Sequence, residues 1–280
     1  MPLITISSPI GCNEMEVATI AARGLGVEIY DDEKLLEMGR KMGLGMEHLK
    51  DMIEPGFLDR LLGQKPQLYM DYMDSIVYEV SRKGEGVILG HGSQMLLRDF
   101  DCALHVRMHA PKAKRMKYFT EQQGLSKEAA SKLIDKTDTN YRGLFRMAFG
   151  RVPSDPSLYD LIINTNKMTV ATAAKIIMDA AKSEMIKQCS LGALESMMKL
   201  SQEKRVKAAL LENHLDNNML VVEVPVDGII EVKGLTYSQG IIDRIERVIK
   251  QVPGVKEVRL ELVVAPVQYG RGIDPLRSHD

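Results

Sequence analysis

Short apolar runs and longer amphipathic stretches follow one another along the first 190 residues. The apolar runs are compact, rich in β-branched residues and bounded by turn residues, which predicts buried strands. These predicted strands lie at 3–6, 27–30, 86–90, 103–108 and 159–164. Apolar residues at helical spacing predict helices between them, for example at 67–82 and 170–187. Alternating strands and helices are typical of a doubly wound α/β fold with a parallel sheet.

The pattern changes near residue 190. Residues 191–213 predict one or two helices, and apolar and polar residues then alternate from Val222 to Val232 around a turn at Asp227-Gly228. An amphipathic helix at 241–249 and a strand at 255–264 follow. We expect a small α+β domain here, separate from the larger sheet.

Composition is that of an ordinary globular protein. The 280 residues are 45% hydrophobic and suffice for two domains, and no apolar run approaches the roughly 18 residues of a membrane span. The N-terminus lacks the pattern of a secretory signal, so we expect a cytoplasmic protein. Three cysteines, far apart and odd in number, predict reduced thiols at Cys12, Cys102 and Cys189.

The net charge of −1 hides a basic block. Residues 107–151 contain eleven Lys or Arg against four acids, so this block carries +7 and the rest of the chain −8. Such a block indicates either an anionic ligand or a solvated helical face. We do not expect nucleic-acid binding, because the block lacks the interleaved aromatic residues of stacking platforms.

The first sixteen residues after Pro2 combine a strand, a turn with Gly11 and a helix. This unit can bind phosphate, because the free N–H groups at a helix N-terminus attract anions. The consensus for that task, G-x-x-x-x-G-K-[ST], supplies a Lys for the phosphates and a hydroxyl for Mg²⁺. Here Glu14-Met15-Glu16 stand in place of G-K-[ST]. The sequence therefore predicts a phosphate loop that lacks the consensus Lys and Ser/Thr.

Several segments, in order, resemble the cytidylate kinase-like family, a branch of the P-loop nucleoside monophosphate kinases. They are I-T-I-S at 4–7, V-I-L-G-H-G-S at 87–93, Leu97-Arg98-Asp99, H-V-R-M-H-A-P at 105–111 and D-P-S-L-Y-D-L-I-I-N-T at 155–165. The resemblance implies a P-loop kinase-like domain with a helical lid over residues 1–187. It also implies a nucleotide ligand, with ATP and Mg²⁺ as cofactors if the protein is active.

A second resemblance covers the small domain. A V-x-V-x-V strand, Gly228, Gly234 and V-P-G-V at 252–255 are similar to a BON domain. We place this BON-like domain at 201–265, after a helical linker at 188–200 and before a flexible tail at 266–280. BON modules imply an unidentified protein or membrane partner.

The chain departs from the kinase pattern at several positions. Gly11 and Glu16 are kept, but Asn13 and Glu14 replace glycines and Met15 replaces the basic residue. His91 stands where the family has an Arg in a G-R-G turn. Tyr141 stands where a lid Arg is expected, although Arg142 and Arg146 are close enough to substitute.

The predicted site follows from this alignment. Phosphoryl transfer needs positioning and positive charge around the phosphate oxygens, and we predict catalytic roles for Arg142, Arg146 and Arg98. Arg107 and Arg151 are further sources of charge, with a surface role favoured for Arg107. The predicted nucleotide-binding residues are Ser7, Gly11, Cys12, Asn13, Glu14, Met15, Glu16, Asp31, Gly90, His91, Gly92 and Arg115. Asp31 either orients the nucleotide or a metal, or caps a helix together with Asp32. No metal ligand set is predicted.

Two functions remain open at this point. In the first, the protein phosphorylates a CMP-like nucleoside monophosphate with ATP, weakly because of the altered loop. In the second, it is an inactive kinase-fold nucleotide sensor or scaffold that contacts a partner or membrane through the BON-like domain.

Overall fold

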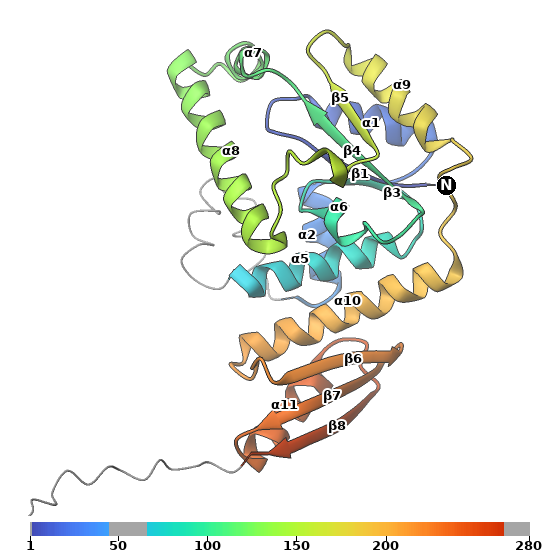
Figure 1. Ribbon diagram of the computed structural model, residues 1–280, viewed down its shortest axis with the longest axis vertical. Helices are drawn as coiled ribbons and strands as arrows, with labels where there is room; N and C mark the ends of the chain where they lie inside the picture. The colour runs from blue at the N-terminus through green and yellow to red at the C-terminus, as the bar shows by residue number, and fades with distance from the viewer. Residues whose placement is uncertain (1, 45–65, 266–280) are drawn as a thin grey trace, which may run out of the picture.

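The computed structural model describes residues 2–44 and 66–265, which form two sheets of different size (Figure 1). The larger sheet belongs to the N-terminal part of the chain. The smaller sheet lies beyond a long helix, α10 (Leu191–Glu212), that runs between the two (Figure 1). The flexible tail predicted at 266–280 lies outside the described residues.

Five parallel strands form the larger sheet, in the order β2-β3-β1-β4-β5. They are β1 (Leu3–Ser7), β2 (Ile29–Tyr30), β3 (Gly86–Leu89), β4 (Ala103–His109) and β5 (Leu161–Asn164). β1 is central and buried along its whole length, between β3 and β4. In such sheets ligands bind outside the carboxyl ends of the strands, where the strand order reverses. The end of β1 at Ser7 is that point.

Helices cover both faces of this sheet because successive strand residues point to opposite faces. Ile4 and Ile6 belong to one apolar layer, and Leu3 belongs to the other. The first layer packs against α1 (Glu14–Leu25) and α9 (Val170–Ala181). The second packs against α2 (Asp32–Lys41), α5 (Pro66–Ser81) and α6 (Ser93–Leu96). The architecture is therefore a three-layer α/β fold.

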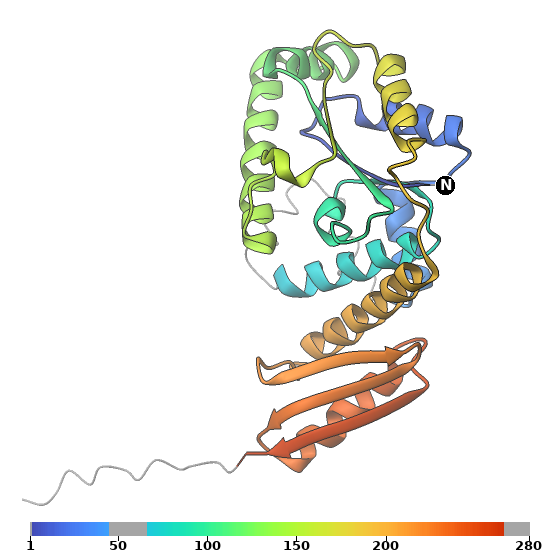
Figure 2. The same cartoon turned by 45° about the vertical axis from the view of Figure 1, so that its right-hand side comes forward.

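Two helices after β4 correspond to the predicted lid. They are α7 (Lys112–Gln122) and α8 (Lys127–Phe149), and α8 stands along one side of the molecule (Figures 1 and 2). α8 begins as the sequence predicts, because the Ser126 hydroxyl accepts a hydrogen bond from the Ala129 N–H at 3.1 Å. A short 3-10 helix, η1 (Pro156–Leu158), then leads into β5.

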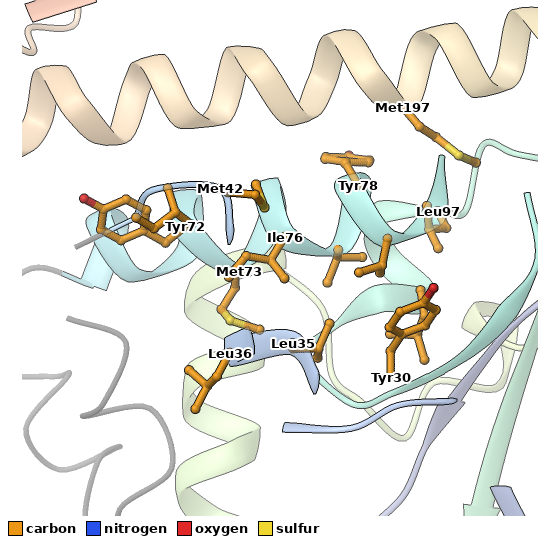
Figure 3. Packing of buried hydrophobic residues seen from close by; sticks show 14 of the residues in the cluster. Tyr30, Leu35, Leu36, Met42, Tyr72, Met73, Ile76, Tyr78, Leu97 and Met197 are labelled. Atoms are coloured by element: carbon orange, nitrogen blue, oxygen red, sulfur yellow. The ribbon is translucent and has the colours of Figure 1, made fainter. Parts of the chain in front are cut away.

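α10 packs along α5 and joins the two parts of the protein (Figure 3). Met197 of α10 is fully buried and reaches toward Leu97 (Figure 3). Polar contacts fix the same interface, since the Ser201 hydroxyl donates to the Ser75 carbonyl at 2.9 Å. Lys204 of α10 pairs with Asp74 at 2.8 Å and with Asp71 at 3.1 Å. A half-buried cation with two carboxylates fixes the position of one helix on the other.

The smaller sheet has the order β6-β7-β8. Its elements are β6 (Leu220–Val226), β7 (Ile229–Thr236), α11 (Gln239–Gln251) and β8 (Glu257–Val264). β6 and β7 are antiparallel, whereas β8 returns parallel to β7 through α11. Val206 and Leu210 of α10 share the core of this unit with Ile245 and Ile249 of α11. The unit is thus completed by the helix that also packs on α5.

The structure confirms the predicted parallel α/β sheet, which is consistent with a P-loop kinase fold, and a separate small α+β unit. The predicted domain boundaries stay predictions. α9 ends at Ala181 rather than near residue 187.

The prediction of three reduced thiols is wrong. Cys102 and Cys189 form a disulfide, and among the described cysteines Cys12 alone is free. The bond joins the start of β4 to the residue before Ser190, whose hydroxyl caps α10. The prediction failed because it relied on the separation of the cysteines in the sequence. Cys102 and Cys189 are 87 residues apart in the chain, but the fold brings them together. The predicted cytoplasmic location stays a prediction.

Replacing both cysteines, Cys102→Ala with Cys189→Ala, is expected to lower the free energy of unfolding by about 2–4 kcal/mol. The reason is that the crosslink restricts the unfolded chain over a long loop. Denaturant unfolding followed by circular dichroism measures the loss. Alkylation of the denatured wild type without reductant should label one thiol, and labelling of all three would contradict the disulfide.

Candidate functional site

The turn after β1 is a phosphate-type loop in geometry. Gly11 and Asn13 both have left-handed backbones, with φ of 80° and 60°. A Cβ at Gly11 would lie 2.9 Å from the Phe119 ring and 3.3 Å from the Arg115 carbonyl oxygen, so α7 packs directly under the loop. Turns of this kind direct successive backbone N–H groups toward one point and form an anion-binding concavity. α1 then begins at Glu14.

The Glu14 side chain is half-buried at the start of α1 and lines the cavity beside this loop. Burial raises the pKa of Glu14, and hydrogen bonding to loop N–H groups and to the Ser8 hydroxyl opposes the shift. Met15 is 43% exposed and Glu16 is also exposed. The positions that hold Lys and Ser/Thr in an active loop therefore point to solvent.

Two adjoining cavities open beside the loop at the carboxyl ends of β1 and β3. The first has a volume of about 650 Å³ and is lined by four carboxylates: Glu14, Asp31, Asp32 and Glu33. The second, about 320 Å³, lies between α5 and α8 and is lined largely by apolar residues, including four Tyr or Phe rings; we call it the aromatic cavity. Asp32 and Gly90 line both. Among the described residues, no Lys or Arg lines either cavity.

The aromatic wall comes from residues four apart on α8. Tyr141, Phe145 and Phe149 follow one another with ring centroids 5.8 Å and 5.0 Å apart. Tyr69 of α5 faces the same cavity. The site prediction missed these residues, although the spacing of the three α8 aromatics was a visible signal for one shared helical face.

The Gly90-His91-Gly92 turn lies where the two cavities meet. His91 Nε2 is 2.8 Å from Asp32 Oδ1, and this hydrogen bond lowers the pKa of Asp32. Gly92 must be glycine, since its φ is 68° and a Cβ would lie 2.5 Å from the Phe149 ring. The capping alternative weighed for the Asp31-Asp32 pair holds for Asp31 but not for Asp32. Asp31 caps α2 by accepting the Lys34 N–H at 2.9 Å, whereas Asp32 binds His91.

Arg115 is buried and already paired. Its guanidinium donates to both carboxylate oxygens of Asp138, at 3.0 and 2.7 Å, and to the Ile10 carbonyl at 3.4 Å. These contacts tie the lid helices α7 and α8 to the loop, and hydrogen bonding to Asp138 raises the pKa of Arg115. Its charge is therefore balanced inside the protein.

Arg107 is the basic residue that contacts the loop without an acidic partner among the described residues. It stands opposite Ser7 in the β1–β4 pairing and donates to the Ser7 hydroxyl at 2.8 Å. The guanidinium also lies over the Tyr159 ring, 5.7 Å from its centroid. Tyr141, which lines the aromatic cavity, is 3.4 Å from the same Ser7 hydroxyl. The sequence favoured a surface role for Arg107, although strand alternation places it on the same face as His105.

The three arginines predicted to be catalytic lie elsewhere. Arg142 and Arg146 share a face of α8 as their spacing predicts, but both are exposed and neither lines a cavity. Arg98 is exposed and pairs with Asp99 at 3.3 Å. Because Tyr141 and Phe145 turn inward, the neighbouring arginines turn outward.

The loop residues of the predicted site do come together. Ser7 ends β1, Gly11, Cys12 and Asn13 lie in the turn, and Glu14, Met15 and Glu16 begin α1. Asp31, Gly90, His91 and Gly92 line the adjoining cavities. Cys12 is buried, and burial raises the pKa of its thiol to about 12. The thiol is therefore not poised as a nucleophile. No group of three or more potential metal ligands occurs among the described residues.

The model of the cytidylate kinase-like family matches residues 3–167, more than half of the chain. The chain belongs to this family. A cytidylate kinase of Thermoplasma volcanium is 22% identical over 179 residues, which cover 63% of this chain and 89% of that protein. A cytidylate kinase of Pyrobaculum aerophilum is 24% identical over 181 residues, covering 64% and 92%.

A solved structure of an uncharacterized protein from Eubacterium ventriosum has the same fold. Its TM-score is 0.53 at 20% identity, and the match covers 65% of this chain and 99% of that one. The family match ends at residue 167, so it does not extend to α10 or the smaller sheet. No described helix is both long and apolar enough to cross a membrane.

Proposed function

We propose that this protein binds a nucleoside monophosphate of the cytidylate type and transfers phosphoryl groups weakly or not at all. One observation supports this most directly: no described Lys or Arg lines the cavities beside the loop, and Glu14 lines the first of them. Phosphoryl transfer depends on positioning and on positive charge around the transferred group. The family supplies the expectation of a nucleotide ligand.

The residues of the loop do not fit ATP and Mg²⁺ in the usual way. Met15 offers no charge for the phosphates, and Glu16 offers no hydroxyl for a metal. Glu14 and the neighbouring Asp31 and Asp32 bring negative charge to the cavity beside the loop. We therefore derive no step that passes through a bound triphosphate.

The aromatic cavity suits a nucleobase. Tyr69, Tyr141 and Phe145 provide flat apolar surfaces on its walls, and base–aromatic stacking contributes about 1–3 kcal/mol per base. Arg107 is the candidate for the single phosphate, because it reaches the Ser7 hydroxyl that Tyr141 also approaches. A monophosphate needs fewer cations than a triphosphate, which agrees with Arg107 as the arginine at this end of the site that has no acidic partner among the described residues.

A second function, nucleotide sensing, is favoured by Asp74. This carboxylate lines the aromatic cavity and also pairs with Lys204 of α10 at 2.8 Å. Burial raises the pKa of Asp74, while Lys204 opposes the shift. A ligand that contacts Asp74 therefore acts on the residue that holds α10 in place. Sensing and weak catalysis are compatible, since both need binding without fast turnover.

We further propose that the smaller unit is a BON-like domain through which the protein contacts a protein or membrane partner. The order of its elements, two paired strands followed by a helix and a third strand, agrees with the sequence resemblance. α10 belongs to the core of this unit and also packs on α5. It therefore provides the physical connection from the cavity to this domain.

The proposal predicts very low turnover with ATP, CMP and Mg²⁺. A coupled assay of ADP formation should give a rate below roughly 0.01 s⁻¹, against about 1–100 s⁻¹ for kinases. The missing basic residue at Met15 is the reason. A rate in the ordinary kinase range would refute the proposed loss of activity, whatever the affinity for CMP.

Arg107→Ala is expected to weaken CMP binding at least about tenfold, as the loss of a charged hydrogen bond to phosphate implies. Isothermal titration calorimetry measures the change. Arg98→Ala is the matched control, since Arg98 is exposed and paired with Asp99. If Arg98→Ala weakens CMP binding and Arg107→Ala does not, the sequence prediction of Arg98 is correct and the structural assignment is wrong.

Sensing predicts that CMP slows amide hydrogen exchange in α10 of the wild-type protein. Asp74→Asn should abolish this effect because it breaks the connection between the cavity and Lys204. Asp71→Asn should retain it, since Asp71 pairs with the same lysine but does not line the cavity. Unchanged exchange in α10 at saturating CMP would rule out sensing by this route.

A further inference from the structure

The two edges of the smaller sheet differ in how open they are to a further strand. β6 forms one edge, and it carries Pro225 and a register shift between Glu223 and Val226. A proline and a bulge are devices that keep an edge strand from pairing with another chain. β8 forms the other edge (Figures 1 and 2), and its eight residues pair with β7 in one unbroken register. β8 itself contains neither device.

The backbone of β8 directs half of its hydrogen-bonding groups away from β7. The N–H groups of Glu257 and Ala265 point inward, since they donate to the Gly228 and Thr236 carbonyls at 3.0 and 2.8 Å. Successive residues of a strand face opposite ways. The even-numbered residues of β8, among them Leu260, therefore point their N–H and C=O groups outward, where a further strand would bond them.

The apolar side chains of β8 are incompletely covered. Val258, Leu260 and Leu262 face the core of the small unit but are only half-buried. Ile230 and Val232, which stand beside Val258 and Leu260 in β7, are fully buried. The difference arises because no described strand lies beyond β8. A further strand at this edge would cover these side chains.

The charges on the open face of β8 are complementary to themselves. Arg259 and Glu261 lie two residues apart and so on one face. Arg259 pairs with Glu231 and Glu257 at 3.1 and 2.8 Å, whereas Glu261 forms no ion pair among the described residues. If a second β8 lies antiparallel with Leu260 opposite its own copy, each Arg259 stands opposite Glu261 of the second copy. Centring the pairing on Arg259 or on Glu261 instead would place like charges opposite each other, which is destabilising.

We propose that this chain forms a homodimer through β8, in which the two small sheets join into one. The partner is a second copy of the chain, and the Arg259–Glu261 complementarity sets the register. In this register the outward groups of Leu260 bond to its own copy. The Arg259–Glu261 pairs then fall at the positions where antiparallel strands bring side chains closest. This inference rests on the proposed partner contact of the small unit and names the partner, while the nucleotide site takes no part in it.

The test measures self-association of the full chain by sedimentation velocity over a range of concentrations. The wild type is expected to dimerise. Glu261→Arg should weaken dimerisation at least about tenfold, because the twofold axis puts two like-charge contacts in each dimer. Glu223→Arg is the matched control, since it makes the same charge change on the same sheet face but on β6. It should change the dissociation constant by less than about threefold.

The double variant Arg259→Glu with Glu261→Arg restores opposite charges across the axis. It should regain most of the affinity that Glu261→Arg loses, which a variant that had merely lost its fold would not do. A wild type that stays monomeric at every concentration would overturn the inference. Equal losses in Glu261→Arg and Glu223→Arg, or no rescue in the double variant, would overturn it as well.

Two further measurements separate this inference from the proposed function. Binding of a monomeric wild type to phosphatidylserine vesicles would overturn the second copy as partner and leave the partner contact of the small unit in place. Calorimetric titration of CMP into the wild type and Glu261→Arg should give the same affinity. If CMP binds to neither, the proposed nucleotide site fails, while sedimentation still decides the role of β8.

Discussion

The backbone N–H groups of the loop after β1 constrain what the rest of this site can bind. Backbone N–H groups that converge on one point need an acceptor, because a polar group without a partner is costly to bury. In an active P-loop kinase the nucleotide supplies that acceptor. Here the turn has left-handed Gly11 and Asn13, and the side chains beside it are the carboxylates of Glu14, Asp31 and Asp32. The backbone of the turn is therefore suited to an anion, whereas the adjoining cavity is lined by negative charge.

Among the described residues, the basic block does not place its positive charges in the cavities beside the loop. Arg115 is bound by Asp138 beneath the loop, and Lys112 pairs with Asp135 on the lid. Arg142 and Arg146 face solvent because the aromatic side chains of α8 take the inner face. The block of charge +7 is thus partly structural and partly solvated, and it does not surround the loop. Arg107 differs because it comes from a strand, whose alternation directs it toward Ser7.

Much of the fold could be predicted from the sequence. Apolar runs such as 3–6 and 86–90 predict buried strands directly, and five parallel strands are present. The loop residues were predicted as a group because they are contiguous. The aromatic cavity and the Cys102–Cys189 bond were not predicted, because both join residues far apart in the sequence. The orientation of the lid arginines was also missed, since spacing gives a shared face but not which face turns inward.

α5 connects the proposed weak catalysis with the added unit of this chain. One side of the helix lines the aromatic cavity through Tyr69 and Asp74, and α10 packs along the helix on another side (Figure 3). In a kinase, fast turnover requires lid and helix motions that repeat at every cycle. A helix bound along its length to α10, and to the smaller sheet through it, is less free to make such motions. Through the same contacts, α5 and α10 connect the aromatic cavity with the smaller sheet.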